Sequence, residues 1–119
     1  MGKRVLLIAN EYTTIINFRM ELIIALIHEK HQVAVALPEH DRNQEIRALG
    51  CKIFNLKISR KSKNPLKDLA LLKSIETILD SFKPDIVFTF TIKPNVYGGI
   101  ACASRKIPYV ANITGRSEE

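Results

Sequence analysis

The residues best suited to bind a polar ligand follow an apolar run in the second half of the chain. Residues 85–90 are almost entirely apolar and rich in β-branched and aromatic side chains, which predicts a buried strand. Residues 91–95 form a polar turn that contains Lys93 and ends on Asn95, a residue type that caps helices. From residue 96 the sequence predicts a helix that opens on Gly98 and Gly99. A strand, a polar turn and a helix N-terminus in this order predict an anion or sugar site at the carboxyl edge of a parallel sheet.

A second set of polar residues follows the first apolar run, residues 4–9, and would form the other wall of such a site. The predicted loop at 10–16 contains Asn10 but no glycine. A domain that binds NAD or FAD would carry G-x-G-x-x-G here so that its backbone can approach a pyrophosphate, and therefore no such cofactor, nor any other, is expected. Asn17 and Arg19 open a predicted helix over 17–30. A cation in a first helical turn opposes the helix dipole, so Arg19 is expected to serve a buried ion pair or an anionic ligand.

Each candidate also has a structural interpretation, and the sequence leaves both open. Lys93 is either a ligand for an anion or an exposed turn lysine. Asn95 is more simply a helix cap, and loop turns explain Asn10 and Asn17 nearly as well as ligand contacts do. The glycine pair is better explained by close packing of a helix on the sheet than by a phosphate cradle.

The sequence lacks the residue patterns expected for a zinc site, a redox-active cysteine pair or a catalytic triad. His28 and His31 stand three apart, do not form an H-E-x-x-H motif and have no third ligand nearby in sequence, so no zinc site is expected. Cys51 and Cys102 are far apart and form no C-x-x-C motif, which is typical of a reduced, cytoplasmic protein. No Ser/His/Asp arrangement or acidic pair stands at a predicted strand end, so no catalytic residue is assigned.

The charge balance favours an anionic partner. The 119 residues carry 18 Lys and Arg against 12 Asp and Glu, a formal charge of +6. Four of the cations, Arg60, Lys61, Lys63 and Lys67, lie in or just after a basic loop at 59–64. Near an anionic bilayer each would add about 1 kcal/mol of attraction, so a peripheral membrane contact is one interpretation and a solvated loop is the other. No aromatic residues are interleaved with these charges, so nucleic acid is not an expected partner.

The elements that position these residues alternate along the chain. Apolar runs predict strands at 4–9, 32–37, 51–58, 85–90 and 108–113, and helical periodicity predicts helices at 17–30, 41–49, 65–82 and from 96. This alternation predicts a single Rossmann-like α/β domain over residues 1–119, a three-layer sandwich with a parallel five-stranded sheet and helices on both faces. Two strand orders compete, 3-2-1-4-5 and the flavodoxin-like 2-1-3-4-5, and the long helix at 65–82 favours the first because it can cross over the sheet. The buried face of that helix is expected to carry Leu69, Leu72, Ile75, Leu79 and Phe82.

Several short motifs follow one another along the chain. They are residues 5–10 (Val-Leu-Leu-Ile-Ala-Asn), 17–19 (Asn-Phe-Arg), 59–60 (Ser-Arg), 64–66 (Asn-Pro-Leu), 83–87 (Lys-Pro-Asp-Ile-Val), 89–95 (Thr-Phe-Thr-Ile-Lys-Pro-Asn), 97–98 (Tyr-Gly) and 112–115 (Asn-Ile-Thr-Gly). In this order and spacing they make the chain resemble, over essentially its whole length, the N-terminal domain of a GT-B glycosyltransferase of the family 4 type. The closest likeness is to bacterial capsular or exopolysaccharide sugar transferases.

The resemblance implies an acceptor-binding domain that is incomplete, with the nucleotide-sugar donor held mostly by a C-terminal domain absent from residues 1–119. It implies a lipid-linked or oligosaccharide acceptor, a cytoplasmic location that extends to the inner face of the membrane, and no turnover by this chain alone. Substrate-binding residues are expected at the crevice between the first and fourth strands; they are Asn10, Asn17, Arg19, Thr91, Lys93, Asn95, Thr114 and Gly115. Many relatives of this type carry a histidine at the end of the fifth strand, where this chain has Thr114, so no catalytic histidine is carried over.

Two other functions remain open. One is a flavodoxin-like binding or signalling domain, although a receiver domain would need acidic residues where the chain has Asn10-Glu11 and Ser59-Arg60. The other is one subunit of a split glycosyltransferase whose donor domain is on another polypeptide. In either case the fifth strand, which holds Tyr109 and Val110, is expected to be a bare sheet edge that favours self-association.

Overall fold

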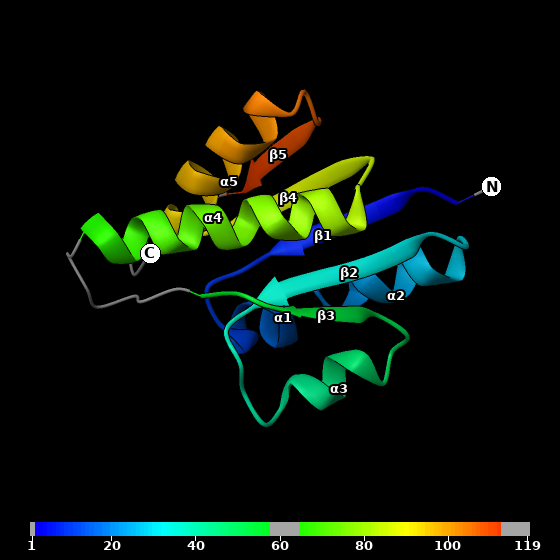
Figure 1. The fold of residues 1–119 in the computed structure, drawn as a ribbon. Helices are drawn as coiled ribbons and strands as arrows, with labels where there is room; N and C mark the ends of the chain where they lie inside the picture. Colours follow the sequence, from blue (N-terminus) through cyan, green and yellow to red (C-terminus); the bar gives the residue numbers. More distant parts are fainter. Residues whose placement is uncertain (1, 58–64, 113–119) are drawn as a thin grey trace.

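The fold is a five-stranded parallel sheet with helices on both faces (Figure 1). The computed structural model describes residues 2–57 and 65–112. Its strands are β1 (Arg4–Ile8), β2 (Gln32–Leu37), β3 (Lys52–Asn55), β4 (Ile86–Phe90) and β5 (Tyr109–Asn112). They are ordered β3-β2-β1-β4-β5 and every neighbouring pair is parallel. The predicted order 3-2-1-4-5 is confirmed, and the flavodoxin-like order is wrong.

Strand β1 is the centre of the sheet and is buried on both sides. Val5 pairs with Val33 of β2 on one side and with Ile86 of β4 on the other. Because successive side chains of a strand point to opposite faces, Leu6 packs in the hydrophobic cluster of one face and Leu7 in the cluster of the other. This two-sided burial explains the unbroken apolar run at residues 4–9.

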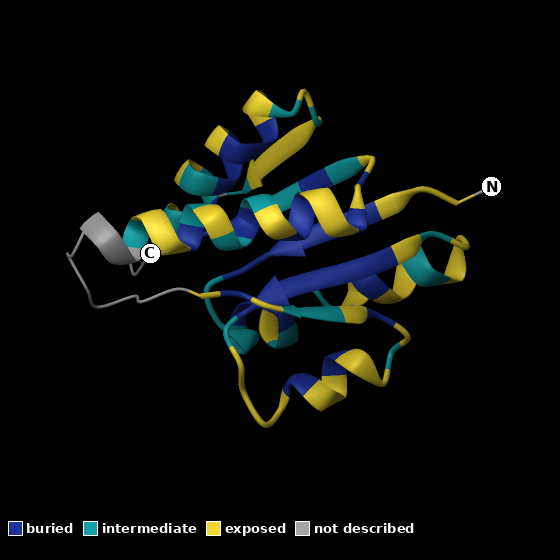
Figure 2. Cartoon of the chain, in the orientation of Figure 1, coloured by how far each residue is buried: buried dark blue, intermediate teal, exposed yellow. Residues whose placement is uncertain are grey.

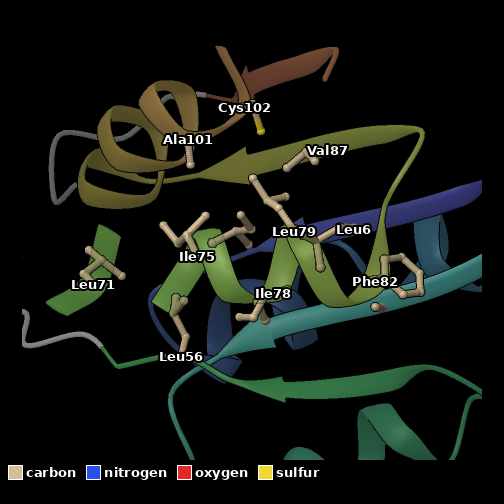
Figure 3. Packing of buried hydrophobic residues seen from close by; sticks show 13 residues of the cluster. Leu6, Leu56, Leu71, Ile75, Ile78, Leu79, Phe82, Val87, Ala101 and Cys102 are labelled. Atoms are coloured by element: carbon tan, nitrogen blue, oxygen red, sulfur yellow. The ribbon is translucent and has the colours of Figure 1, made fainter. Parts of the chain in front are cut away.

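Helices α4 (Pro65–Phe82) and α5 (Ile92–Ser104) cover one face of the sheet. Figure 3 shows the inner side chains of α4 packed over the sheet; they are Leu71, Ile75, Ile78, Leu79 and Phe82. The prediction that Leu69 belongs to this face is wrong, because Leu69 is 49% exposed. Leu69 stands two residues before Leu71, and about 200° of helix rotation turns it away from the sheet.

The other face is covered by α1 (Tyr12–Phe18), α2 (Met20–His28) and α3 (Asn43–Arg47). Ile15, Ile23 and Ile46 are their fully buried hydrophobic residues, and they pack in one cluster with Leu7 and Phe90 of the sheet. The helices on the two faces complete the three-layer sandwich that the sequence predicts.

The first crossover differs from its prediction. The sequence predicts a loop at 10–16 and one helix over 17–30, whereas α1 begins at Tyr12 and the chain bends at Arg19 (φ −128°, ψ 5°) before α2 starts. The run 13–16 is made of β-branched residues, which have low helix propensity. The complete burial of Ile15 against the sheet stabilises the helix in spite of that propensity.

The α3 region is shorter than the predicted 41–49 and ends at Arg47, before the glycine. Asp41 lies in the turn before α3 rather than at its start. Ala48 is the C-cap residue, and Gly50, with φ +107° in the left-handed region, lies two positions beyond it. Strand β3 follows as one edge of the sheet, which confirms its predicted place.

Helix α5 begins earlier than predicted. Thr91 is its N-cap residue, and Pro94 falls in the first turn, where a missing N–H breaks no helical hydrogen bond. The prediction that Asn95 caps the helix is wrong, because its main-chain N–H already donates to the Thr91 carbonyl at 3.0 Å. Further along, a Cβ atom at Gly98 would lie 2.7 Å from Cγ2 of Thr89, so the expected close packing of this helix on β4 is confirmed.

Strand β5 forms the second edge of the sheet and is exposed (Figure 2). Tyr109 and Val110 are 42% and 43% exposed. Within the described ranges β5 pairs with β4 and with no other strand, as the sequence predicts for an edge.

Gly98→Ala is expected to destabilise the protein by about 1–3 kcal/mol, because the added methyl group overlaps Thr89 in a packed interface. Gly99→Ala is the matched control. The same change there raises helix propensity by up to about 1 kcal/mol, and the new Cβ would meet the ring end of the exposed Tyr109 at 3.0 Å. Urea unfolding measures both free energies, and equal losses for the two variants would contradict the close approach at Gly98.

Candidate functional site

The carboxyl ends of β1 and β4 carry polar residues side by side. Ile8 pairs with Thr89 in the sheet, and Asn10 and Thr91 each follow two residues later at the same edge. The Asn10 Oδ1 atom is buried and has no hydrogen-bond partner among the described residues. An unsatisfied buried acceptor costs about 1–3 kcal/mol, so the burial of this oxygen is an energetic cost that no contact among the described residues offsets.

Arg19 approaches this edge from the helical layer. It is the C-cap residue of α1 and the N-cap residue of α2, and not a first-turn residue as the sequence predicts. Its guanidinium carbon lies 4.7 Å from the ring centroid of Phe90, the fully buried last residue of β4. Stacking on an aromatic ring fixes the plane of a guanidinium, so the sheet edge that holds Asn10 and Thr91 also holds an oriented cation.

Thr91 has an unusual backbone conformation. It is 8% exposed and has φ 73° and ψ 174°, a left-handed φ that is costly for a β-branched residue. Its hydroxyl group donates to the Phe90 carbonyl. Strain of this kind costs of the order of 1–3 kcal/mol and clusters at ligand sites, which supports a functional role for the turn between β4 and α5.

Asn95 organises the edge from within α5. Thr89 Oγ1 donates to Asn95 Oδ1 at 2.7 Å, and Asn95 Nδ2 donates to the Asn112 carbonyl at 3.0 Å. Asn112 Nδ2 in turn donates to the Thr89 carbonyl at 3.3 Å. Both ends of the Asn95 amide are therefore engaged in joining α5 to the ends of β4 and β5, and its predicted contact with substrate stays a prediction.

Lys93 is paired with an acid that the sequence analysis missed. Its Nζ atom lies 2.9 Å from Oδ1 of Asp68 on α4, and the Tyr97 hydroxyl donates to Oδ2 of Asp68 at 3.1 Å. The hydrogen bond from Lys93, helped by that from Tyr97, holds the pKa of Asp68 below its usual range, and the bond to Asp68 raises the pKa of Tyr97. Asp68 and Lys93 are 25 residues apart in sequence, and they meet because α4 and α5 lie side by side on the same face of the sheet.

The remaining predicted residues are placed as follows. Asn17 lies on α1 and is exposed. Thr114 and Gly115 lie outside the described residues, as do Arg60, Lys61 and Lys63. Lys67 belongs to the first turn of α4, but its side chain is not described.

A cluster of polar and aromatic residues beside β1 and β2 was also missed by the sequence analysis. The rings of Tyr12 and His40 lie 3.9 Å apart, and the Arg42 guanidinium carbon lies 5.4 Å from the Tyr12 centroid. Arg42 binds Glu45 through two hydrogen bonds, of 2.7 and 3.1 Å. The hydrogen bonding from Arg42 is the main cause of the lowered pKa of Glu45. No sequence motif joins these four residues, because they come from two different crossovers.

The described ranges give little support for a thiol nucleophile, a metal site or a membrane-spanning helix. Burial raises the pKa of both Cys51 and Cys102 to about 11, so both are thiols rather than nucleophilic thiolates at neutral pH. Residues 2–57 and 65–112 contain no group of three His, Cys, Asp or Glu side chains that could hold a metal ion. In the same ranges no helix has both the length and the apolar character needed to cross a bilayer.

Lys93→Met is expected to reduce stability at neutral pH and to lose this effect in acid. The folded-state pKa of Asp68 lies below the unfolded value of about 3.9, so the pair contributes stability above that pH and loses it as the pH falls through the folded pKa. The difference in free energy of unfolding between wild type and variant should be fully present at about pH 6 and should shrink steadily as the pH falls below about 3.9. Lys73→Met, which changes an exposed lysine of the same helix as Asp68, is the control; a difference of equal size above and below about pH 3.9 would rule out the pair as its cause.

The chain matches the family described as glycosyl transferase 4-like over residues 4–117. It is 33% identical over 96 residues to the N,N'-diacetylbacillosaminyl-diphospho-undecaprenol alpha-1,3-N-acetylgalactosaminyltransferase of Campylobacter jejuni, which covers 81% of this chain and 26% of that protein. Among solved structures it resembles MurG of Acinetobacter baumannii (TM-score 0.72, 23% identity, 94% of this chain and 34% of that one). A glycosyltransferase of Rickettsia africae gives a TM-score of 0.74 at 17% identity, over 92% of this chain and 29% of that one.

The two structural likenesses establish a shared fold. In each case this chain spans about a third of the length of the solved protein. The chain also spans about a quarter of the curated relative that it matches. The family match extends from the first residue of β1 to beyond β5 and so includes the residues at the carboxyl ends of β1 and β4. On this evidence the chain belongs to the glycosyl transferase 4-like family.

Proposed function

We propose that this chain is the acceptor-binding, N-terminal part of a nucleotide-sugar-dependent glycosyltransferase that acts in cell-surface polysaccharide synthesis. The observation that carries the proposal is the family match over residues 4–117. The name of the Campylobacter jejuni relative specifies an acceptor in which a sugar is joined through a diphosphate to undecaprenol. A lipid-linked sugar diphosphate of this kind is the acceptor class that we infer for the present chain.

The geometry of the carboxyl edge supports this assignment. A sugar diphosphate presents a doubly charged anion beside hydroxyl groups, and the edge combines an oriented guanidinium, Arg19, with a buried amide oxygen, Asn10 Oδ1. In this proposal Arg19 binds the diphosphate with its N–H groups. Lys93 has a lesser part, because its charge is balanced by Asp68 and it serves to tie α5 to α4.

The donor sugar nucleotide is assigned to a further domain, on the same polypeptide or on a separate subunit. The chain spans about a quarter of the curated relative, and no described residue forms a glycine-rich phosphate loop. We therefore expect no sugar transfer by this chain alone. Co-purification with a nucleotide-sugar-binding partner would favour the split arrangement.

The location proposed for the protein is the cytoplasmic face of the membrane. A polyprenyl acceptor remains in the bilayer, and the basic residues Arg60, Lys61, Lys63 and Lys67 would each add about 1 kcal/mol of attraction to anionic lipid. Three of these residues lie outside the described ranges, so this part of the proposal rests on charge alone.

Arg19→Gln is expected to weaken the binding of a soluble short-chain prenyl-diphospho-N-acetylglucosamine by about tenfold or more, because a charged hydrogen bond contributes about 1.5–3 kcal/mol. Isothermal titration calorimetry of the whole chain measures the dissociation constant. Lys3→Gln makes the same charge change at the amino edge of the sheet and is the matched control. Equal weakening by the two variants would show that only net charge matters and would remove Arg19 from the site.

Val110→Lys is expected to reduce self-association of the chain. A lysine on an exposed edge strand disfavours pairing with a second edge, and Val110 is 43% exposed on β5. Multi-angle light scattering across a concentration series measures the molar mass. Ile24→Lys, on the exposed surface of α2, is the control, and a wild-type protein that stays monomeric at high concentration would contradict the role of this edge.

A further inference from the structure

A cavity of about 410 Å³ lies at the amino edge of the sheet, at the opposite ends of the strands from the candidate site. The last turn of α4 reaches this edge (Figure 1), and the cavity is walled by that helix end and by the sheet. Its lining includes the residues that begin β1, β2 and β3, the residue before β2 and the last two residues of α4; they are Arg4, Gln32, Lys52, His31, Ser81 and Phe82. Strand β2 has six residues, so about 20 Å separates this cavity from the carboxyl edge.

The three residues that begin the strands share one face of the sheet. Side chains alternate along a strand, and the residue two positions after each of the three packs in the hydrophobic cluster beneath α4. Arg4, Gln32 and Lys52 therefore lie on the α4 side. Neighbouring strands are about 4.8 Å apart, so the two cations approach the cavity from strands about 10 Å apart, on either side of β2.

The cavity is rich in hydrogen-bond donors. Arg4 donates from Nη1 to the Phe82 carbonyl at 3.2 Å, and a guanidinium has further N–H groups to offer. His31 Nδ1 accepts a hydrogen bond from the Lys3 main-chain N–H at 2.9 Å, so the neutral imidazole carries its proton on Nε2. The ammonium group of Lys52 can only donate. A ligand that fits this set of groups must be rich in acceptors.

The positive charge of the cavity is not balanced by acids. None of the described lining residues is acidic, and in the described part of the chain neither Arg4 nor Lys52 forms an ion pair. The Asp85 carboxylate accepts the main-chain N–H of Arg4 at 2.8 Å and does not pair with its guanidinium. Each helix that ends at this edge adds at most about half a negative charge, and the Phe82 carbonyl of α4 is already bound. Two full cations remain in excess, so the cavity favours an anion.

We propose that this cavity binds a small phosphate monoester, with the phosphate group held between Arg4 and Lys52 and hydrogen-bonded by His31 Nε2. Phosphate oxygens are strong acceptors, and they match guanidinium and ammonium groups. Ligand cavities begin at about 300 Å³, so a cavity of 410 Å³ has room for an organic group beside Gln32 and Ser81 as well as for the phosphate. The site is at the far end of the strands from the Arg19 crevice, and the inference does not depend on the proposed function. Its ligand would stabilise the folded chain by mass action and would not be a substrate.

The test is an NMR titration of the whole isotope-labelled chain with glycerol 3-phosphate at constant ionic strength. The ester should shift the Arg4 side-chain signal and the main-chain amides of residues 31–33 and 50–52, whereas uncharged glycerol should shift none of them. Arg4→Gln and Lys52→Gln should each weaken binding by about tenfold, because each removes a charged hydrogen bond. Lys106→Gln is the matched control and should bind like the wild type, since Lys106 is an exposed lysine that also follows a helix end at the amino edge but does not line the cavity.

Lys52 is exposed and its ammonium group makes no hydrogen bond to a described residue, so Lys52→Gln keeps the test valid where Arg4→Gln does not fold. Sedimentation with vesicles of phosphatidic acid in phosphatidylcholine separates a free ester from a lipid headgroup as the source of the phosphate. Binding to these vesicles with no shift by glycerol 3-phosphate would overturn the small-ligand site. Equal weakening by Lys52→Gln and Lys106→Gln, or shifts confined to residues outside the cavity, would overturn it as well.

Discussion

Burial of β1 on both faces of the sheet decides where polar chemistry can stand in this protein. Leu6, Leu7 and Ile8 are fully buried, and most residues of the neighbouring strands β2 and β4 are buried as well. A polar ligand group inside such a sheet would lose its hydration without compensation. Binding groups are therefore displaced to the ends of the strands, where the chain turns and main-chain and side-chain polar atoms become available.

At the carboxyl edge, the helices supply what the strands cannot. Arg19 is held by the ring of Phe90, and the Asn95 amide ties α5 to the ends of β4 and β5. Asp68 and Lys93 then fix the start of α5 against α4. These contacts come from three separate crossovers, and together they fix the helices against the carboxyl edge of the sheet.

The sheet and its order could be predicted from sequence because both depend on long apolar runs and on one long crossover helix, which are strong signals. Helix α1 could not, because its β-branched residues have poor helix propensity and are helical only through the burial of Ile15.

The site was predicted as a set of residue types and not as a set of contacts. Asn10, Arg19 and Thr91 do lie at one edge. By contrast, the engagement of Asn95, the partner of Lys93 and the left-handed φ of Thr91 depend on contacts between segments far apart in the chain.

The position of β1 has a consequence for synthesis. Val5 pairs with Val33 of β2 and with Ile86 of β4. Strand β2 is synthesised soon after β1 and can pair with it early, whereas Ile86 is synthesised 81 residues after Val5. Ribosomes add roughly 5–20 residues per second, and the second side of β1 stays open for roughly 4–16 s. During that interval the nascent chain displays an apolar ribbon with unpaired amides, which chaperones can recognise and which a neighbouring nascent chain can mispair with. The strand that anchors the finished molecule is thus its most vulnerable segment while it is being translated.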